Sequence, residues 1–189
     1  LEEFFRLMRT GDMEGVWQDL QALQLTNRFL PEFRKWLTRN NNTERMTKRF
    51  AALDEAVQDG LTPSYSLLIA VLFGPSVEDQ ENPKRRTVRV RDSNQAAAAL
   101  VRPFQQRARL PRAEVDAAIR ILQIQSTLFF PDAHGSGSKR DRRKNWFLGE
   151  TWFGDALEAL RCRLIAENED LSAYDLWHER VLSLHQGSR

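Results

Sequence analysis

The sequence has 189 residues and a formal net charge of +2, and 41% of its residues are hydrophobic, so a sizeable core can be buried. No apolar run approaches the roughly 18 residues that span a bilayer. No secretory signal pattern opens the chain, and the single cysteine, Cys162, excludes an internal disulfide framework. We therefore expect a cytoplasmic protein without a membrane span. Because the sequence begins with Leu1 rather than Met, we also expect it to be part of a longer protein.

Charge is unevenly distributed along the chain. Residues 1–83 carry a net charge of −4, residues 84–144 a net charge of +10, and residues 145–189 a net charge of −4. Mixed signs would serve solubility, so separation of this size indicates an anionic partner for the middle segment.

Five helices are predicted within the first 74 residues, because apolar side chains recur every three or four positions between residues that start or stop a helix. These helices begin near Glu2, Asp12, Pro31, Thr43 and Ser64. The fifth is the most apolar stretch of the chain, so we expect it to lie centrally. We expect it to stop at Gly74-Pro75, since proline breaks a helix interior.

The segment 75–92 is polar and contains Pro83, which predicts a loop. Residues 87–91 alternate as a strand does, but the sequence offers no partner strand. A helix is predicted from Gln95, and Pro103 is expected to kink or end it. Another helix is predicted from Pro111 to Phe130.

The stretch HGSGSKRDRRKNWF, residues 134–147, joins small residues to five cations and then to a Trp-Phe pair. Its first twelve residues predict a loop. A long helix is predicted over 146–167, although Gly149 and Gly154 indicate that its regular part begins later. We expect Trp146 and Phe147 to anchor this helix in the core. A last helix is predicted from Ser172 to Gly187.

These elements predict an all-α protein, a bundle of about nine or ten helices packed as hairpins. The predicted parts are an N-terminal helical body over 1–74, a polar basic loop over 75–92, and a C-terminal helical tail over 93–189 with a basic loop at 134–145. Alternatively, the two helical parts form one continuous domain. Five side chains are expected in the core because they lie at helical spacing among apolar neighbours: Trp17, Trp36, Trp152, Cys162 and Trp177.

No catalytic or metal site is predicted. The three histidines, His134, His178 and His185, have no further ligands at suitable spacing. The Gly-Ser-Gly-Ser stretch at 135–138 lacks the Gly-Lys-Ser/Thr that completes a phosphate-binding loop, and no Asp-x-Asp pair occurs.

Four stretches, in their order along the chain, resemble the C-terminal helical region of bacterial poly(A) polymerase, a polynucleotide adenylyltransferase related to tRNA nucleotidyltransferases. Residues 1–33 carry two helices separated by a small-residue break and then a hydrophobic pair before proline. Residues 53–75 carry an apolar helix introduced by Thr-Pro. Residues 106–128 lead into a helix with glutamine in its second half, and residues 152–168 place Phe and Ala before Leu-Arg.

This resemblance implies that the chain holds RNA whose 3′ end is extended with AMP from ATP, in bacterial mRNA processing by RNA polyadenylation. In that family a preceding catalytic head carries a Gly-Ser motif and an Asp-x-Asp pair that binds magnesium. The resemblance therefore implies that ATP and magnesium belong to the head, and that this chain alone holds no cofactor and adds no nucleotides. The chain departs from the family pattern in its two polar loops, 75–92 and 135–145. Family members often carry a very basic tail as well; none follows His185 in the given sequence, either because it was removed or because this member lacks it.

The predicted RNA-binding residues are arginines and lysines of the basic middle segment, since forked guanidinium groups suit phosphate oxygens. They are Arg85, Arg86, Arg89, Arg91, Arg107, Arg109, Arg112, Lys139, Arg140, Arg142, Arg143 and Lys144. Convergence of these groups would give roughly six or more phosphate contacts and a steep loss of affinity with salt.

Several alternatives stay open from the sequence. The charged runs are also typical of solvated loops, and Trp146 is either a core residue or a side chain that stacks on bases. An acidic stretch, Glu167–Asp170, is equally typical of a helical protein-interaction or scaffolding domain that binds no nucleic acid. A complete enzyme of another kind would require a set of titratable groups that the sequence does not present.

Overall fold

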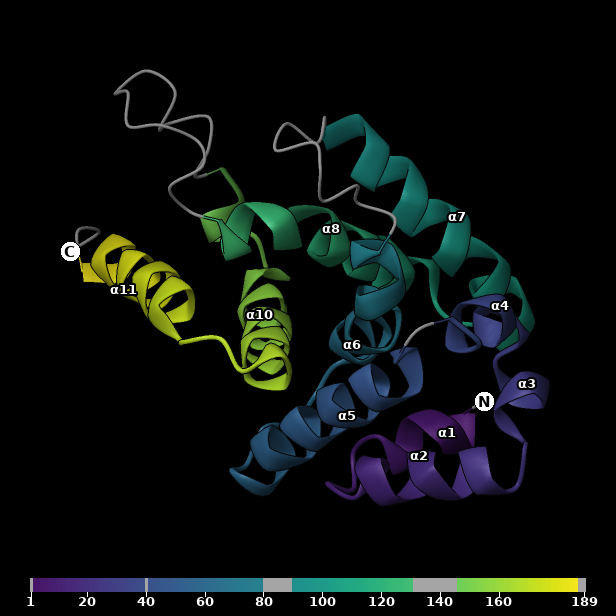
Figure 1. Ribbon diagram of the computed structural model, residues 1–189. Helices are drawn as coiled ribbons and strands as arrows, with labels where there is room; N and C mark the ends of the chain where they lie inside the picture. Colours follow the sequence, from purple (N-terminus) through teal and green to yellow (C-terminus); the bar gives the residue numbers. More distant parts are fainter. Residues whose placement is uncertain (1, 40, 80–89, 131–145, 187–189) are drawn as a thin grey trace.

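The computed structural model describes residues 2–39, 41–79, 90–130 and 146–186, with side chains at 90–95 and 184–186 left out. Within these ranges the chain forms ten α-helices, two short 3-10 helices and no strand, which confirms the all-α prediction (Figure 1). The elements are α1 Glu2–Leu7, α2 Met13–Ala22, α3 Thr26–Phe29, η1 Pro31–Phe33, α4 Arg34–Leu37, α5 Asn42–Gln58, α6 Tyr65–Glu78, α7 Val90–Ala108, α8 Arg112–Phe129, η3 Trp146–Gly149, α10 Phe153–Glu167 and α11 Ser172–Gln186.

Helix α6 is the centre of the fold. It is apolar on all sides, and every residue of 66–77 is buried, as expected for a helix with neighbours all around it. Helices α5, α7, α8 and α10 all contact it, while α1 and α2 lie against one end of the molecule and α11 at the other (Figure 1). The ring of Phe73 on α6 lies 4.8 Å from that of Phe33 and 5.2 Å from that of Phe104, so this core joins η1 to α7.

Both proline positions lie inside helices. Helix α6 continues through Gly74-Pro75 to Glu78, so the predicted stop was wrong. The hydroxyl of Ser76 donates to the carbonyl of Phe73 at 2.9 Å, which satisfies one backbone acceptor near the proline, and burial together with ion pairs at Glu78 favours the extra turn. Helix α7 begins at Val90 and runs through Pro103, so the proline does not end the helix, which was one of the two outcomes expected there. The loop predicted over 75–92 is helical over 75–78 and 90–92, and residues 90–91 form no strand. Residues 80–89, which contain the rest of the predicted loop and strand, lie outside the described residues.

Trp146 and Phe147, the aromatic pair that follows the basic loop 134–145, differ in burial. The ring of Phe147 is buried as expected, but Trp146 is 58% exposed, so its predicted place in the core was wrong. Both belong to η3, and the regular helix α10 begins only at Phe153, in agreement with the weakening effect of the two glycines.

The other predicted core residues are largely confirmed. Three tryptophans, Trp17, Trp152 and Trp177, are buried, whereas Trp36 is half-buried and donates its indole N–H to Asp79 at 2.6 Å. The thiol of Cys162 is fully buried, and burial raises its pKa to about 12, so it is a packing group and not a nucleophile. No helix in the described part of the chain is long and apolar enough to cross a membrane.

Candidate functional site

The predicted RNA-binding residues are only partly described by the structure. Nine of the twelve have no described side chain: Arg85, Arg86, Arg89, Lys139, Arg140, Arg142, Arg143 and Lys144 lie outside the described residues, and Arg91 lies on α7 with its side chain left out. The remaining three, Arg107, Arg109 and Arg112, lie together at the junction of α7 and α8.

Arg107 connects α7 to the end of α3 and to η1. Its guanidinium group forms a fork with the carboxylate of Glu32, in which Nη2 donates to Oε2 at 2.7 Å and Nε donates to Oε1 at 3.0 Å. It also donates to the carbonyl of Phe29 at 3.0 Å. The same group lies over the ring of Phe104. Because a carboxylate already occupies this fork, Arg107 holds α3 and η1 against α7 and has little capacity left for a phosphate.

Arg109 and Arg112 are both exposed to solvent. Arg109 follows the end of α7 in a left-handed backbone conformation, with φ of 53°, which turns the chain toward α8. Arg112 opens α8, and its side chain is 84% exposed with only a distant ion pair, 3.6 Å from Asp116. Both guanidinium groups are therefore accessible to an anion.

Four further cations lie on the short helices α3 and α4 or just after α4, and the sequence reasoning missed them. Arg28, Arg34, Lys35 and Arg39 are all exposed, and none forms a salt bridge with a carboxylate in the described ranges. The net charge of −4 over residues 1–83 concealed them, although Glu32 is the only acid between Thr26 and Arg39. A shorter window for counting charge would have found this group.

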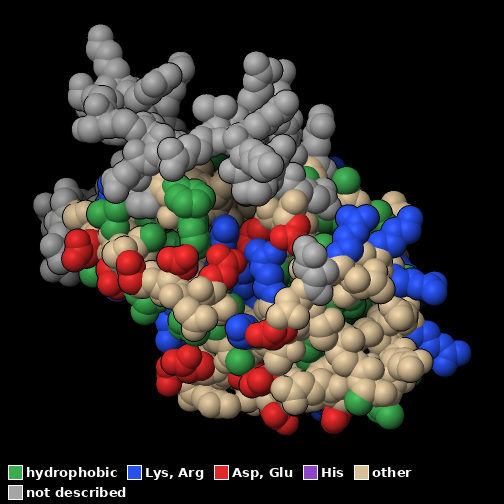
Figure 2. Space-filling view, viewed as in Figure 1, with side chains coloured by type: hydrophobic (Ala, Val, Ile, Leu, Met, Phe, Trp, Pro, Cys, Tyr) green, Lys and Arg blue, Asp and Glu red, His purple; other side chains and the backbone are tan. Residues whose placement is uncertain are grey.

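The Arg107–Glu32 fork places these four cations on the same edge of the molecule as the α7–α8 junction. Figure 2 shows Lys and Arg side chains gathered along the right-hand side, where Figure 1 labels α4 and the end of α7, whereas Asp and Glu lie mainly toward the left and the bottom. We call this surface the basic edge, made of Arg28, Arg34, Lys35, Arg39, Arg109 and Arg112. Five of its six cations have no described carboxylate as a partner, so the edge carries an uncompensated positive field.

A second group of charged residues is buried and has a different role. Arg49 on α5 lies 3.1 Å from Glu78 on α6 and 3.2 Å from Glu167 on α10, and Arg163 on α10 lies 3.5 Å from Glu78 and 3.4 Å from Glu167. The side chains of Arg49 and Glu78 are only 3% and 6% exposed. With Arg45 and Asp79 at its rim, this buried ionic cluster contains three arginines and three carboxylates and joins three helices.

The electrostatics of the cluster centre on Glu78. Burial by itself would raise the pKa of this carboxyl, but the nearby positive charges of Arg49, Arg163 and Arg45 outweigh it and lower the pKa below its ordinary value. The pKa of Arg45 is raised in turn, since the attraction of Glu78 and Asp79 outweighs desolvation. Glu78 is therefore ionised in the folded protein and bound to its arginines, which makes the cluster a structural junction.

The acidic stretch that favoured a protein-interaction domain is partly used within the fold. Glu167 belongs to the buried ionic cluster, and the carboxylate of Asp170 accepts a hydrogen bond from the backbone N–H of Ser172 at 2.9 Å. Neither group is fully available to an outside partner.

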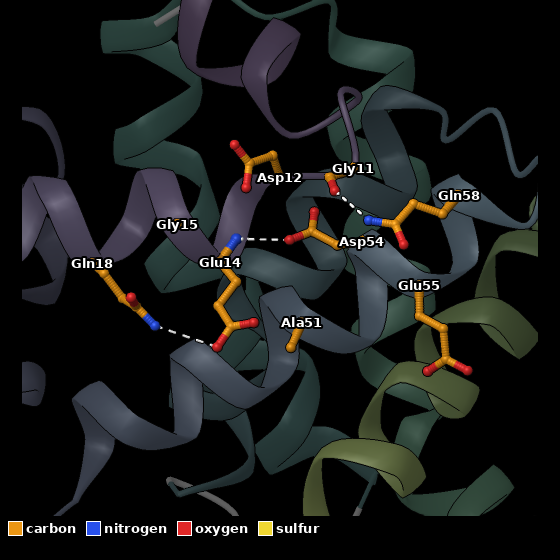
Figure 3. Close-up of a pocket in the computed structure, with 9 residues that line it drawn as sticks. All are labelled: Gly11, Asp12, Glu14, Gly15, Gln18, Ala51, Asp54, Glu55 and Gln58. Atoms are coloured by element: carbon orange, nitrogen blue, oxygen red, sulfur yellow. Dashed lines mark hydrogen bonds between the residues drawn. The ribbon is translucent and has the colours of Figure 1, made fainter.

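A polar hollow of about 480 Å³ lies between α2 and α5 (Figure 3). No cation is among the residues that line it, which are Gly11, Asp12, Glu14, Gly15, Gln18, Ala51, Asp54, Glu55 and Gln58. The carboxylate of Asp54, from α5, accepts hydrogen bonds from the backbone N–H groups of Met13 at 2.8 Å and Glu14 at 2.7 Å. These bonds satisfy the first turn of α2, so the hollow's central acid is a helix cap, and its negative charge opposes the binding of an anion.

Replacing Asp54 with alanine is expected to lower the free energy of unfolding by about 1 to 2 kcal/mol, because two backbone donors of α2 lose their acceptor. Burial raises the pKa of Asp54, while its two backbone hydrogen bonds act in the opposite direction. Urea unfolding measures the change. The matched control is Glu55→Ala, an exposed neighbour on the same helix, for which a change within about 0.5 kcal/mol is expected. Equal effects of the two variants would contradict the capping role.

No protein family matches this chain, and no curated protein or solved structure is significantly similar to it. Among residues 2–39, 41–79, 90–130 and 146–186, no three His, Cys, Asp or Glu side chains are grouped so that they could hold a metal ion. The basic edge is therefore the feature from which a function is inferred.

Proposed function

We propose that this chain is an RNA-holding module of a poly(A) polymerase-like nucleotidyltransferase. It grips RNA whose 3′ end is extended with AMP from ATP by a catalytic head that this sequence does not contain. ATP and magnesium act in that head, and the chain by itself transfers no nucleotide. The proposed setting is the bacterial cytoplasm.

The observation that supports RNA binding most directly is the basic edge. Its six cations are exposed, and five have no carboxylate partner in the described part of the chain. Five of the six are arginines, whose planar groups donate two parallel hydrogen bonds to phosphate. The basic runs over 84–91 and 139–144, seen in the sequence alone, extend the same argument.

The poly(A) polymerase part of the proposal rests on the order of four sequence stretches, and the helical fold is compatible with it. Gln125, in the third stretch, donates its side-chain amide to the carbonyl of Ala156, in the fourth, at 3.0 Å. The two stretches thus pack against each other as parts of one helical unit.

The proposal predicts salt-sensitive binding to single-stranded RNA. With about six phosphate contacts, the logarithm of affinity should fall with the logarithm of salt concentration with a slope near −4, a loss of roughly 10² to 10³ between about 50 and 200 mM salt. Fluorescence anisotropy with a labelled oligoadenylate measures this dependence. The absence of binding at the lower salt concentration would contradict RNA holding, and incorporation of AMP from ATP by the chain alone would contradict the division between module and head.

A further inference from the structure

One apolar side chain lies within the basic edge. Phe29, the last residue of α3, is 41% exposed, although its neighbour Leu30 and the nearby Phe33 are both buried in the core. Arg28 precedes it in sequence, and Arg34 opens the next α-helix. The segment thus buries two apolar side chains and leaves the ring of Phe29 exposed, between two exposed arginines in the sequence.

The backbone that carries this ring is fixed at several points. The N–H of Phe29 donates to the carbonyl of Leu25 at 3.1 Å, and its carbonyl accepts from the guanidinium group of Arg107 at 3.0 Å. The fork between Arg107 and Glu32 locks the following segment to α7. Because α3 is held from both sides, the ring is presented without a large loss of backbone freedom when a ligand binds.

An exposed aromatic ring beside unpaired arginines has a characteristic ligand. The face of the ring stacks on an unpaired nucleobase, while the cations bind the phosphates that precede and follow that base. A nucleobase inside a duplex has both faces covered by its neighbours, so such a surface discriminates in favour of single strands. Stacking is tolerant of sequence because every base has a π-face.

We propose that Phe29 is a base-stacking residue of the basic edge, and that its ligand is a single-stranded nucleic acid with phosphates on Arg28 and Arg34. This inference rests on the proposed RNA-holding function and adds a residue and a strand preference to it. Trp146, the aromatic residue that follows Lys139–Lys144 in the sequence, was the stacking candidate there; in the described structure Phe29 is an exposed aromatic residue with the exposed Arg28 and Arg34 close to it in sequence.

The test compares Phe29→Ala, Phe29→Leu and Phe29→Tyr with the wild-type chain. The probes are an oligoadenylate carrying a fluorescent adenine analogue and an RNA duplex of the same length. Phe29→Ala and Phe29→Leu are each expected to weaken single-strand binding about tenfold, because one stacked base is lost. Phe29→Tyr should stay within about twofold of wild type, duplex binding should not change, and quenching of the adenine analogue should persist only in proteins with a ring.

The salt dependence separates this proposal from the one on which it rests. Removal of the ring leaves the number of phosphate contacts unchanged, so the salt slope of Phe29→Ala should equal that of wild type. Leu182→Ala, an exposed apolar residue on α11 at the opposite end of the molecule, is the control and should bind as wild type does. Thermal unfolding verifies that each variant is folded.

Three results would overturn the stacking role. The first is a loss of RNA affinity of less than twofold in Phe29→Ala while variants of Arg28 and Arg34 lose affinity strongly. In that case the RNA-holding proposal stands, but Phe29 has no stacking role. The second is full binding by Phe29→Leu, which would show an apolar contact instead of stacking. The third is unchanged RNA binding with a loss of self-association in sedimentation, which would make Phe29 part of a protein interface. Absence of RNA binding by the wild-type chain would contradict both proposals together.

Discussion

Replacing Arg49 with methionine is expected to lower the free energy of unfolding by about 3 to 5 kcal/mol, because a buried carboxylate loses a principal partner. The side chain of Glu78 is only 6% exposed, so water cannot take the place of the guanidinium group. A loss of this size is a large fraction of the 5 to 15 kcal/mol that stabilises an ordinary domain. Chemical denaturation measured by circular dichroism reports the change.

A surface variant on the same helix provides the comparison. Lys48 is adjacent to Arg49, but its ion pair with Glu44 is half-exposed on both sides, at 49% and 51%. Lys48→Met should therefore change stability by no more than about 0.5 kcal/mol. The double variant Arg49→Met with Glu78→Gln should recover part of the loss, since the stranded charge is removed together with its partner. If Lys48→Met and Arg49→Met lower the free energy of unfolding equally, the buried ionic cluster contributes no more to stability than an exposed ion pair.

The same cluster predicts the direction of the pH dependence. The pKa of Glu78 is lower in the folded chain than its ordinary value of 4.5, since the arginines outweigh the effect of burial. A group with a depressed pKa contributes stability above its unfolded value, and this contribution is lost as pH falls through the folded value. We therefore expect the wild-type chain to lose stability below about pH 4.5, and Glu78→Gln to show a shallower loss in that range. Parallel curves for the two proteins would contradict this role.

Neutralising the three cations at α4 and just after it, in what we call the α4 variant, is expected to weaken single-stranded RNA binding by roughly 10² at 0.1 M salt, because about three phosphate contacts disappear. The variant carries Arg34→Gln, Lys35→Gln and Arg39→Gln, three exposed residues without described carboxylate partners. The salt slope should become less steep by about 2, since each contact on a single strand contributes about 0.7. Fluorescence anisotropy over a salt series measures affinity and slope together.

A charge-matched control separates position from net charge. Arg6→Gln, Lys48→Gln and Arg180→Gln together remove three positive charges from α1, α5 and α11, at residues that are not part of the basic edge. This control should lose less than about tenfold in affinity, the part due to long-range attraction alone. If it loses as much as the α4 variant, the basic edge is not the binding surface.

The basic run that was evident in the sequence supplies a second comparison. Neutralising Lys139, Arg140, Arg142, Arg143 and Lys144 is also expected to weaken binding and to flatten its salt dependence while the fold survives. Equal losses from this variant and from the α4 variant would place the RNA across both groups. If only the 139–144 variant loses RNA affinity, the RNA-holding proposal stands but the basic edge is not part of the binding surface.

The sequence by itself determined the class of fold and the core of most helices. Apolar spacing of three and four residues does not depend on distant parts of the chain, so most of the helices and the central place of 64–73 were correctly predicted. Helix α3 was not predicted, and the helix expected from Pro31 is a 3-10 turn followed by the short α4. The proline positions were less well predicted, because the local penalty of Pro75 or Pro103 is outweighed by packing that the sequence does not display. Trp146 was misplaced for a related reason: a short 3-10 turn presents only some of its apolar residues to the core.

Tertiary structure decided which charges are paired and which are free. Arg107 and Arg49 are both arginines on amphipathic helices, and only the folded arrangement brings Glu32 to the first and Glu78 to the second. Likewise, the exposed cations at α3 and α4 belong to an acidic part of the sequence, and the contacts of Arg107 with Glu32 and with the carbonyl of Phe29 hold this segment against α7. Salt bridges between residues 29 to 118 positions apart depend on how helices pack, which short-range sequence patterns do not encode. The distribution of charge along the sequence thus indicated an anionic partner. The packing of the helices defined the surface and the aromatic ring that we propose bind it.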